Sequence, residues 1–85
     1  MPNNAAAIAN QIAQTVKDRR KSLRLSQEAM ADLADIDRTY ASQIERGIAN
    51  PSLSVLCSVA DALDLTFVQL VTGPNQYSDG SISTQ

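Results

Sequence analysis

The 85-residue sequence predicts a small all-α domain of five helices. Its apolar residues recur at intervals of three and four, which is the spacing of a helix with one buried face. Each apolar stretch is flanked by residue types that commonly begin or end helices. Aromatic residues make up only 4% of the chain, so Leu, Ile, Val and Ala must build the core. A chain of this length forms one domain with a thin core.

The first expected helix spans residues 8–23 and follows a frayed N-terminus at residues 1–7. Its apolar stripe consists of Ile8, Ile12, Val16 and Leu23. The second helix begins after Ser26, because a serine side chain accepts a hydrogen bond from the first helical turn. It ends near Ala34, and its expected apolar face consists of Ala29, Met30, Leu33 and Ala34.

A short break at residues 35–37 separates the second helix from the third, which we expect at residues 38–46. Asp37 is suited to cap the start of this helix, and Gly47 to end it. The expected inward face consists of Tyr40, Ala41 and Ile44. Two short helices joined by so tight a break have the arrangement of a helix-turn-helix unit, although many small helical domains contain similar corners.

The fourth expected helix begins after Ser52, since Pro51 disfavours helical backbone at the residue before it. Its apolar face consists of Leu53, Leu56, Val59, Ala60 and Leu63. Thr66 and Gln69 match a capping box for a fifth helix at residues 67–71. Residues 72–85 are polar and rich in turn formers, and we expect a disordered tail there. The folded domain is thus expected at residues 8–71.

The composition excludes several classes of protein. There is one cysteine and no histidine, so neither an internal disulfide nor a Cys/His zinc site can form, and we expect no metal and no cofactor. Cys57 is interpreted as a small core residue. No catalytic set of residues is present, which argues against an enzyme. No apolar run approaches a membrane span, which predicts a cytoplasmic protein.

The charges are unevenly distributed along the chain. The net charge is −2, which alone argues against nucleic-acid binding. However, all seven basic residues lie between Lys17 and Arg46, and five of them fall within residues 17–24. A phosphate backbone responds to such a local patch rather than to the net charge. For each basic residue taken singly, a solvated helix face is the alternative interpretation.

The segment from Leu25 to Ser52, LSQEAMADLADIDRTYASQIERGIANPS, resembles the phage repressor and Cro-like family, also called the xenobiotic-response-element family. The resemblance covers about residues 8–71, and the stretch around Arg38-Thr39-Tyr40 is also similar to restriction–modification controller proteins. It implies a five-helix Cro/repressor-like domain that regulates transcription by binding double-stranded DNA. The family usually has glycine where Asp35 stands, but aspartate tolerates left-handed backbone.

The resemblance implies which residues of the third helix contact bases. The family's base-contacting positions carry Arg38, Thr39, Ser42 and Gln43 here. Arginine can pair with guanine and glutamine with adenine in the major groove. The alternative interpretation is a solvated polar face, and it weighs most for Thr39 and Ser42.

The resemblance also implies contacts with phosphates, from Gln27, Tyr40, Arg46 and Ser52. Helix N-termini favour anions, which supports Gln27 at the start of the second helix. Ser52 can equally serve as a helix cap, and Tyr40 can equally pack against the core. Arg20 and Glu45 match positions that the family joins in a shielded salt bridge, so we interpret both as structural rather than as DNA contacts.

The resemblance further implies a symmetric dimer on a palindromic site, paired through the fifth helix. We expect Phe67, Leu70 and Val71 in that interface, because this helix is too apolar for one face against the core. The alternative is that they seal the core of a monomer. A second functional hypothesis also stays open: the same fold can serve as a protein-interaction module, such as an antitoxin or coactivator, with a protein partner.

Overall fold

The computed structural model describes residues 4–73, and within that range it contains five α-helices and no strand. The helices are α1 (Ala5–Ser22), α2 (Gln27–Ala34), α3 (Arg38–Glu45), α4 (Leu53–Ala62) and α5 (Phe67–Thr72). The predicted all-α fold is confirmed. Helix α1 begins at Ala5 instead of Ile8. The tail was expected from residue 72, but Thr72 is the last residue of α5. Residues 74–85 of that expected tail lie outside the described residues, as do residues 1–3 of the expected frayed N-terminus.

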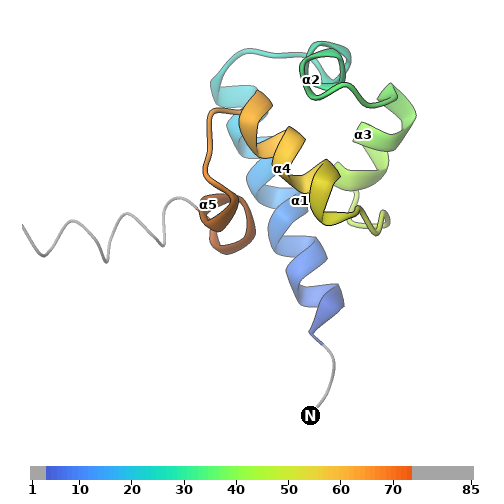
Figure 1. The fold of residues 1–85 in the computed structure, drawn as a ribbon, viewed down its shortest axis with the longest axis vertical. Helices are drawn as coiled ribbons and strands as arrows, with labels where there is room; N and C mark the ends of the chain where they lie inside the picture. Colours follow the sequence, from blue (N-terminus) through green and yellow to red (C-terminus); the bar gives the residue numbers. More distant parts are fainter. Residues whose placement is uncertain (1–3, 74–85) are drawn as a thin grey trace, which may run out of the picture.

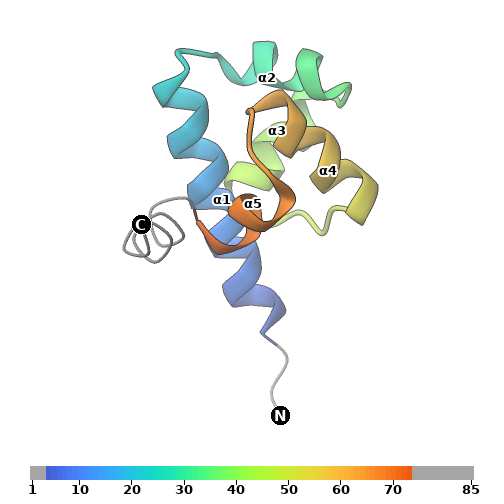
Figure 2. The same ribbon diagram turned by 60° about the vertical axis from the view of Figure 1, so that its left-hand side comes forward.

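Helix α1 is the longest helix and runs along the side of the domain that α3 and α5 cover (Figure 1). It packs against α3 and α5, while α2 packs against α3 and α4. Figures 1 and 2 show α2 at the end of the molecule opposite the start of α1, with α5 beside α1. This arrangement leaves the α2–α3 corner at one end of the domain and the junction of α1 with α5 nearer the other.

The predicted starts of α2, α3, α4 and α5 are confirmed by hydrogen bonds. The side chains of Ser26, Asp37 and Ser52 each accept a bond from a backbone N–H in the first turn of the helix that follows. The donor–acceptor distances are 2.9 Å from Ala29 N, 2.9 Å from Thr39 N and 3.2 Å from Val55 N, respectively. Thr66 and Gln69 form both bonds of a capping box before α5. Such caps satisfy N–H groups that the helix leaves without partners.

Four of the helices are followed by the same backbone conformation. Arg24, Asp35, Gly47 and Asp64 follow α1, α2, α3 and α4, and all four have positive φ. After each of them, the next residue donates its N–H to a carbonyl five residues back, as in a Schellman motif. Only one of the four is glycine, the residue that adopts this conformation without steric cost. The same backbone turn is therefore formed by residues with very different side chains.

The core is built from aliphatic side chains of all five helices and their connections. The buried cluster consists of Ile12, Val16, Met30, Ala31, Ala34, Ala41, Ile44, Val59, Ala60, Leu63, Leu65 and Leu70. Five expected apolar-face or core positions are wrong. Leu33 and Leu53 are 62% and 66% exposed, Ile8 and Leu23 are 49% and 38% exposed, and Cys57 is exposed on α4. Leu23 and Leu53 lie at helix ends, where less of the neighbouring structure covers a side chain.

Candidate nucleic-acid interface

Helix α3 has two opposite faces. Ala41, Ile44 and Glu45 are buried, and their spacing places them on one side of the helix. The other side carries the residues expected to contact bases. Arg38 and Thr39 are exposed, while Ser42 and Gln43 are half-buried. The structure thus brings all four together on one solvent-facing side of α3.

The polar side-chain atoms on this side of α3 have no partners in the part of the protein that the structure describes. Among residues 4–73, the side chains of Arg38, Thr39, Ser42 and Gln43 form no hydrogen bond and no ion pair. An unpaired guanidinium and an unpaired carboxamide have donors and acceptors to spare. This face is therefore chemically able to bind a polar ligand without first breaking internal bonds.

The four residues expected to contact phosphates lie in different settings. Arg46 is exposed at the end of α3, and Ser52 is exposed where its hydroxyl caps α4. Tyr40 is half-buried and packs against the core cluster. Its hydroxyl has no hydrogen-bond partner in the described part of the chain. The ring is therefore packed as expected, while the contact between the hydroxyl and a phosphate stays a prediction.

The first turn of α2 has unused backbone donors. The Ala29 N–H is satisfied by Ser26, and Met30 N donates to the carbonyl of the same serine. The N–H groups of Gln27 and Glu28 have no acceptor within residues 4–73. Because the helix dipole places partial positive charge here, this turn can bind an anion such as a phosphate.

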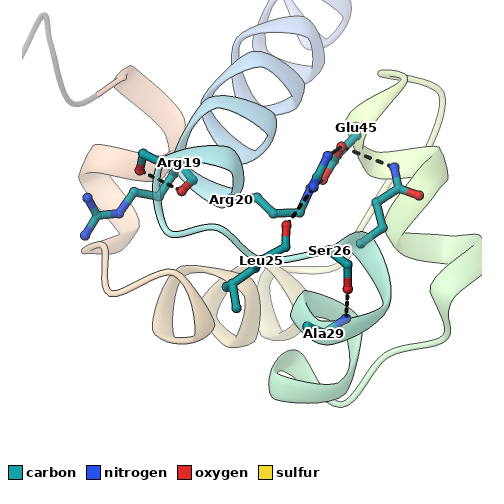
Figure 3. A network of polar contacts seen from close by, with 8 residues as sticks. Arg19, Arg20, Leu25, Ser26, Ala29 and Glu45 are labelled. Atoms are coloured by element: carbon teal, nitrogen blue, oxygen red, sulfur yellow. Dashed lines mark hydrogen bonds and ion pairs between the residues drawn. The ribbon is translucent and has the colours of Figure 1, made fainter.

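Arg20 and Glu45 form a buried ion pair between α1 and α3 (Figure 3). Arg20 Nε lies 2.6 Å from Glu45 Oε2, and Nη2 lies 3.0 Å from Oε1. The side chains are only 13% and 2% exposed. The hydrogen bond to Glu45 raises the pKa of Arg20 above its ordinary value, although burial opposes this. The guanidinium therefore stays charged, and the pair holds the end of α3 against α1.

The sequence interpretation missed the role of Arg19. Its Nε donates to the carbonyl of Leu63 at the end of α4, at 2.9 Å, and its guanidinium also approaches Asp64. The last carbonyls of a helix lack internal partners, and an arginine there is favourable. Arg19 is thus occupied in joining α1 to α4, and no local sequence signal indicates a contact between residues 44 positions apart.

The surface formed by α5 and the start of α1 is partly apolar. Phe67 and Val68 are 37% and 51% exposed, and Ile8 on α1 is 49% exposed. Val71 is half-buried and lines an open hollow with Ile8 and neighbouring residues of α1. Leu70 is fully buried in the core. The expectation that Leu70 lies in a subunit interface is therefore wrong for this structure, because its side chain reaches no surface.

Residues 4–73 meet the requirements of neither a metal site nor a membrane-spanning helix. No group of three Cys, Asp or Glu residues in that range is placed to hold a metal ion. No helix within it is both long enough and apolar enough to cross a membrane.

Comparison with known proteins identifies the chain's relatives. The immunity repressor protein of Bacillus phage phi105 is 40% identical over 60 residues, which cover 71% of this chain but only 42% of the repressor. The control protein C.SmaI of Serratia marcescens is 36% identical over 61 residues, covering 72% of this chain and 73% of that protein. The crystal structure of the restriction–modification controller protein C.AhdI from Aeromonas hydrophila superposes with a TM-score of 0.72 at 36% identity. It covers 75% of this chain and 97% of C.AhdI.

A family model agrees with these relatives and confirms the resemblance drawn from residues 25–52. The helix-turn-helix family model HTH_3 matches residues 16–70, which include all of α2, α3 and α4 and the first four residues of α5. The chain belongs to this helix-turn-helix family, HTH_3, whose members are DNA-binding transcriptional regulators and not enzymes.

Proposed function

We propose that this protein binds a specific sequence of double-stranded DNA with α3 in the major groove. The observation that carries the proposal is the solvent-facing side of α3, where the side chains of Arg38, Thr39, Ser42 and Gln43 have no hydrogen-bond or ion-pair partner among residues 4–73. The second helix of a helix-turn-helix unit reads base edges in this way. Arg38 is suited to guanine and Gln43 to adenine.

Contacts with phosphates fix the orientation of α3 on the DNA in this proposal. The free N–H groups at the start of α2 bind one phosphate together with the side chain of Gln27. Arg46, Tyr40 and Ser52 bind phosphates beside the third helix, and the Ser52 hydroxyl does so while it caps α4. Such contacts supply affinity without sequence preference.

We further propose that two copies pair through α5 and the start of α1. Phe67, Val68 and Ile8 present apolar surface there, and Val71 lies at its edge. A two-fold axis uses the same patch on both subunits. It would set the two α3 helices about 34–36 Å apart, so that they reach half-sites about one turn apart on a palindromic operator. Activity on DNA agrees with the cytoplasmic location expected from the sequence.

Selection from a pool of random duplexes tests DNA recognition directly. The purified chain should enrich a palindromic sequence, and footprinting should then show two protected half-sites about one helical turn apart. Failure to enrich any sequence, at salt concentrations that allow non-specific binding, would refute sequence-specific recognition. It would favour the protein-interaction alternative, which needs no operator.

Sedimentation tests the pairing separately. Val68→Asp should convert a dimer to a monomer at micromolar concentration, because it places a charge in the apolar patch. Val68 suits the test better than Val71, which also packs against the core. The matched control is Leu33→Asp, since Leu33 is similarly exposed but lies on α2. A wild-type monomer that binds one half-site with full affinity would refute the dimer.

A further inference from the structure

The Glu45 carboxylate accepts three hydrogen bonds, and the third does not belong to its ion pair. Two come from Arg20, and Gln27 Nε2 donates the third to Oε1 at 3.2 Å (Figure 3). Arg20 also donates from Nη1 to the carbonyl of Leu25 at 2.8 Å. One network therefore joins the ends of α1 and α3 to the loop before α2 and to the first residue of α2.

This network determines which way the Gln27 side chain faces. A carboxylate has acceptors only, so the Gln27 carboxamide must turn its NH₂ group and not its oxygen toward Glu45. One of the two N–H bonds is then used, and the other stays available. Without Glu45, rotation about the last side-chain bond would exchange the donor and acceptor ends of the carboxamide freely.

The side chain held in this way lies at an anion-binding turn. Gln27 is the first residue of α2, where its own N–H and that of Glu28 have no acceptor within residues 4–73. A phosphate accepts hydrogen bonds and donates none. A carboxamide that presents its second N–H would therefore add to these backbone donors, whereas one that presents its oxygen would oppose them.

We infer that Glu45 is a positioning residue for DNA binding, which holds the Gln27 amide so that it donates to a phosphate. This inference rests on the proposed function. Arg20 is part of the same device, because its charge cancels that of Glu45. A carboxylate so close to a phosphate would otherwise repel it. The buried pair thus contributes to DNA binding through Gln27, without touching the DNA.

A double-mutant cycle tests this coupling. In the wild type, Gln27→Ala should weaken binding to the selected duplex about tenfold, the effect of losing a hydrogen bond to a charged group. The second background is Arg20→Met with Glu45→Leu, since apolar residues often replace a buried ion pair without loss of stability. There, Gln27→Ala should have a clearly smaller effect, because a freely rotating side chain must first be ordered on the phosphate, which offsets much of the bond that it gains.

Two outcomes would overturn the inference. One is a loss that is equal in both backgrounds, which would mean that Gln27 acts independently of Glu45. The other is a Gln27→Ala variant that binds as tightly as the wild type. Gln14→Met, at an exposed and uncharged position of α1 outside the basic stretch 17–24, is the control for a change on the same helix. Absence of any DNA binding by the wild type would instead refute the proposed function.

A second measurement needs no substitution in the ion pair. The side-chain NH₂ signals of Gln27 can be identified in a nitrogen–proton NMR spectrum by their loss in Gln27→Ala. One proton should show the shift of a hydrogen bond to a carboxylate in the free protein, and the other should move when the duplex is added. Two protons that behave as in a free, solvated amide before DNA is added would contradict the inference.

Discussion

The two ends of α3 differ sharply in what surrounds them. At the first end, Asp37 caps the helix, and Arg38 and Thr39 are exposed with no side-chain partners within residues 4–73. At the other end, Ile44 and Glu45 are buried, and Glu45 is tied to α1. One end is thus held rigidly while the other is free to meet a ligand. A helix that contacts base edges needs both properties, because such contacts require exposed groups on a fixed support.

The turns that flank α3 share a backbone conformation but not a residue type. Asp35 before the helix has φ 59°, and Gly47 after it has φ 74°. Asp35 is exposed, whereas Gly47 is half-buried beside Asn10 of α1. The same conformation is thus held by a residue that tolerates it at one side of α3 and by one that prefers it at the other.

The largest expected effect concerns the buried end of α3. Arg20→Ala should lower the free energy of unfolding by about 3–5 kcal/mol, because it leaves the buried Glu45 charge without an opposite charge. Glu45→Ala should act similarly. Thermal and urea unfolding followed by circular dichroism measure this effect. Lys21→Ala, at an exposed position without a partner among the described residues, serves as the control and should change stability by less than about 0.5 kcal/mol.

Unchanged melting temperatures for both Arg20→Ala and Glu45→Ala would show that the pair does not hold α3. The comparison between the two ends of the helix would then fail, since the buried end would be no firmer than the exposed one.

The next effect concerns the exposed end and the face that continues from it. Arg38→Ala and Gln43→Ala should leave the fold intact but relax the preference at a particular base pair, by about 1–3 kcal/mol each. Binding to a panel of duplexes, each with one base pair changed, measures this preference. Gln27→Ala should instead weaken binding to all duplexes alike. A uniform loss for Arg38→Ala would identify a phosphate contact at that position.

Residues with local effects could be predicted from the sequence. Ser26, Asp37, Ser52 and the Thr66 capping box act on N–H groups within three residues of themselves, so their types reveal the helix starts. The tolerance of Asp35 for left-handed backbone is likewise a local property, and the structure confirms it. The solvent-facing side of α3 follows from helical spacing once the boundaries of the helix are known.

Features that depend on packing between helices could not be predicted in the same way. Periodicity places Leu33 and Cys57 among apolar neighbours, but it does not say how wide a face a short helix buries, and both side chains are exposed. The contact of Arg19 with Leu63 and the bond from Gln27 to Glu45 join distant segments. The pairing of Arg20 with Glu45 was expected only because of the family resemblance.

A smaller effect is expected at the turn that follows α3. Gly47→Ala should destabilise the fold by about 1–2 kcal/mol, because an L-residue with a side chain pays that cost in left-handed backbone. A methyl group would also lie 2.8 Å from Asn10 Oδ1, although that flexible side chain can move away. Urea unfolding measures the loss. If Gly47→Ala is neutral but becomes destabilising when Asn10 is replaced by a larger residue, then the space beside Asn10, and not the positive φ, determines the cost of a side chain at this position.

The smallest effect is expected at the turn before α3, and its sign is opposite. Asp35→Gly should stabilise the fold by about 0.5 kcal/mol, because glycine removes the strain of positive φ but makes the unfolded chain more flexible. The hydrogen bond from Ile36 N to the Ala31 carbonyl, at 2.9 Å, uses backbone atoms only and should persist. Precise urea midpoints with equal slopes measure so small a change.

Asp35→Ala is the matched comparison, since it keeps a Cβ without the polar group that makes left-handed backbone tolerable. The expected order of stability is glycine, aspartate, alanine. An alanine variant as stable as wild type would show that Asp35 contributes nothing through its carboxylate, and that the two turns differ only in burial.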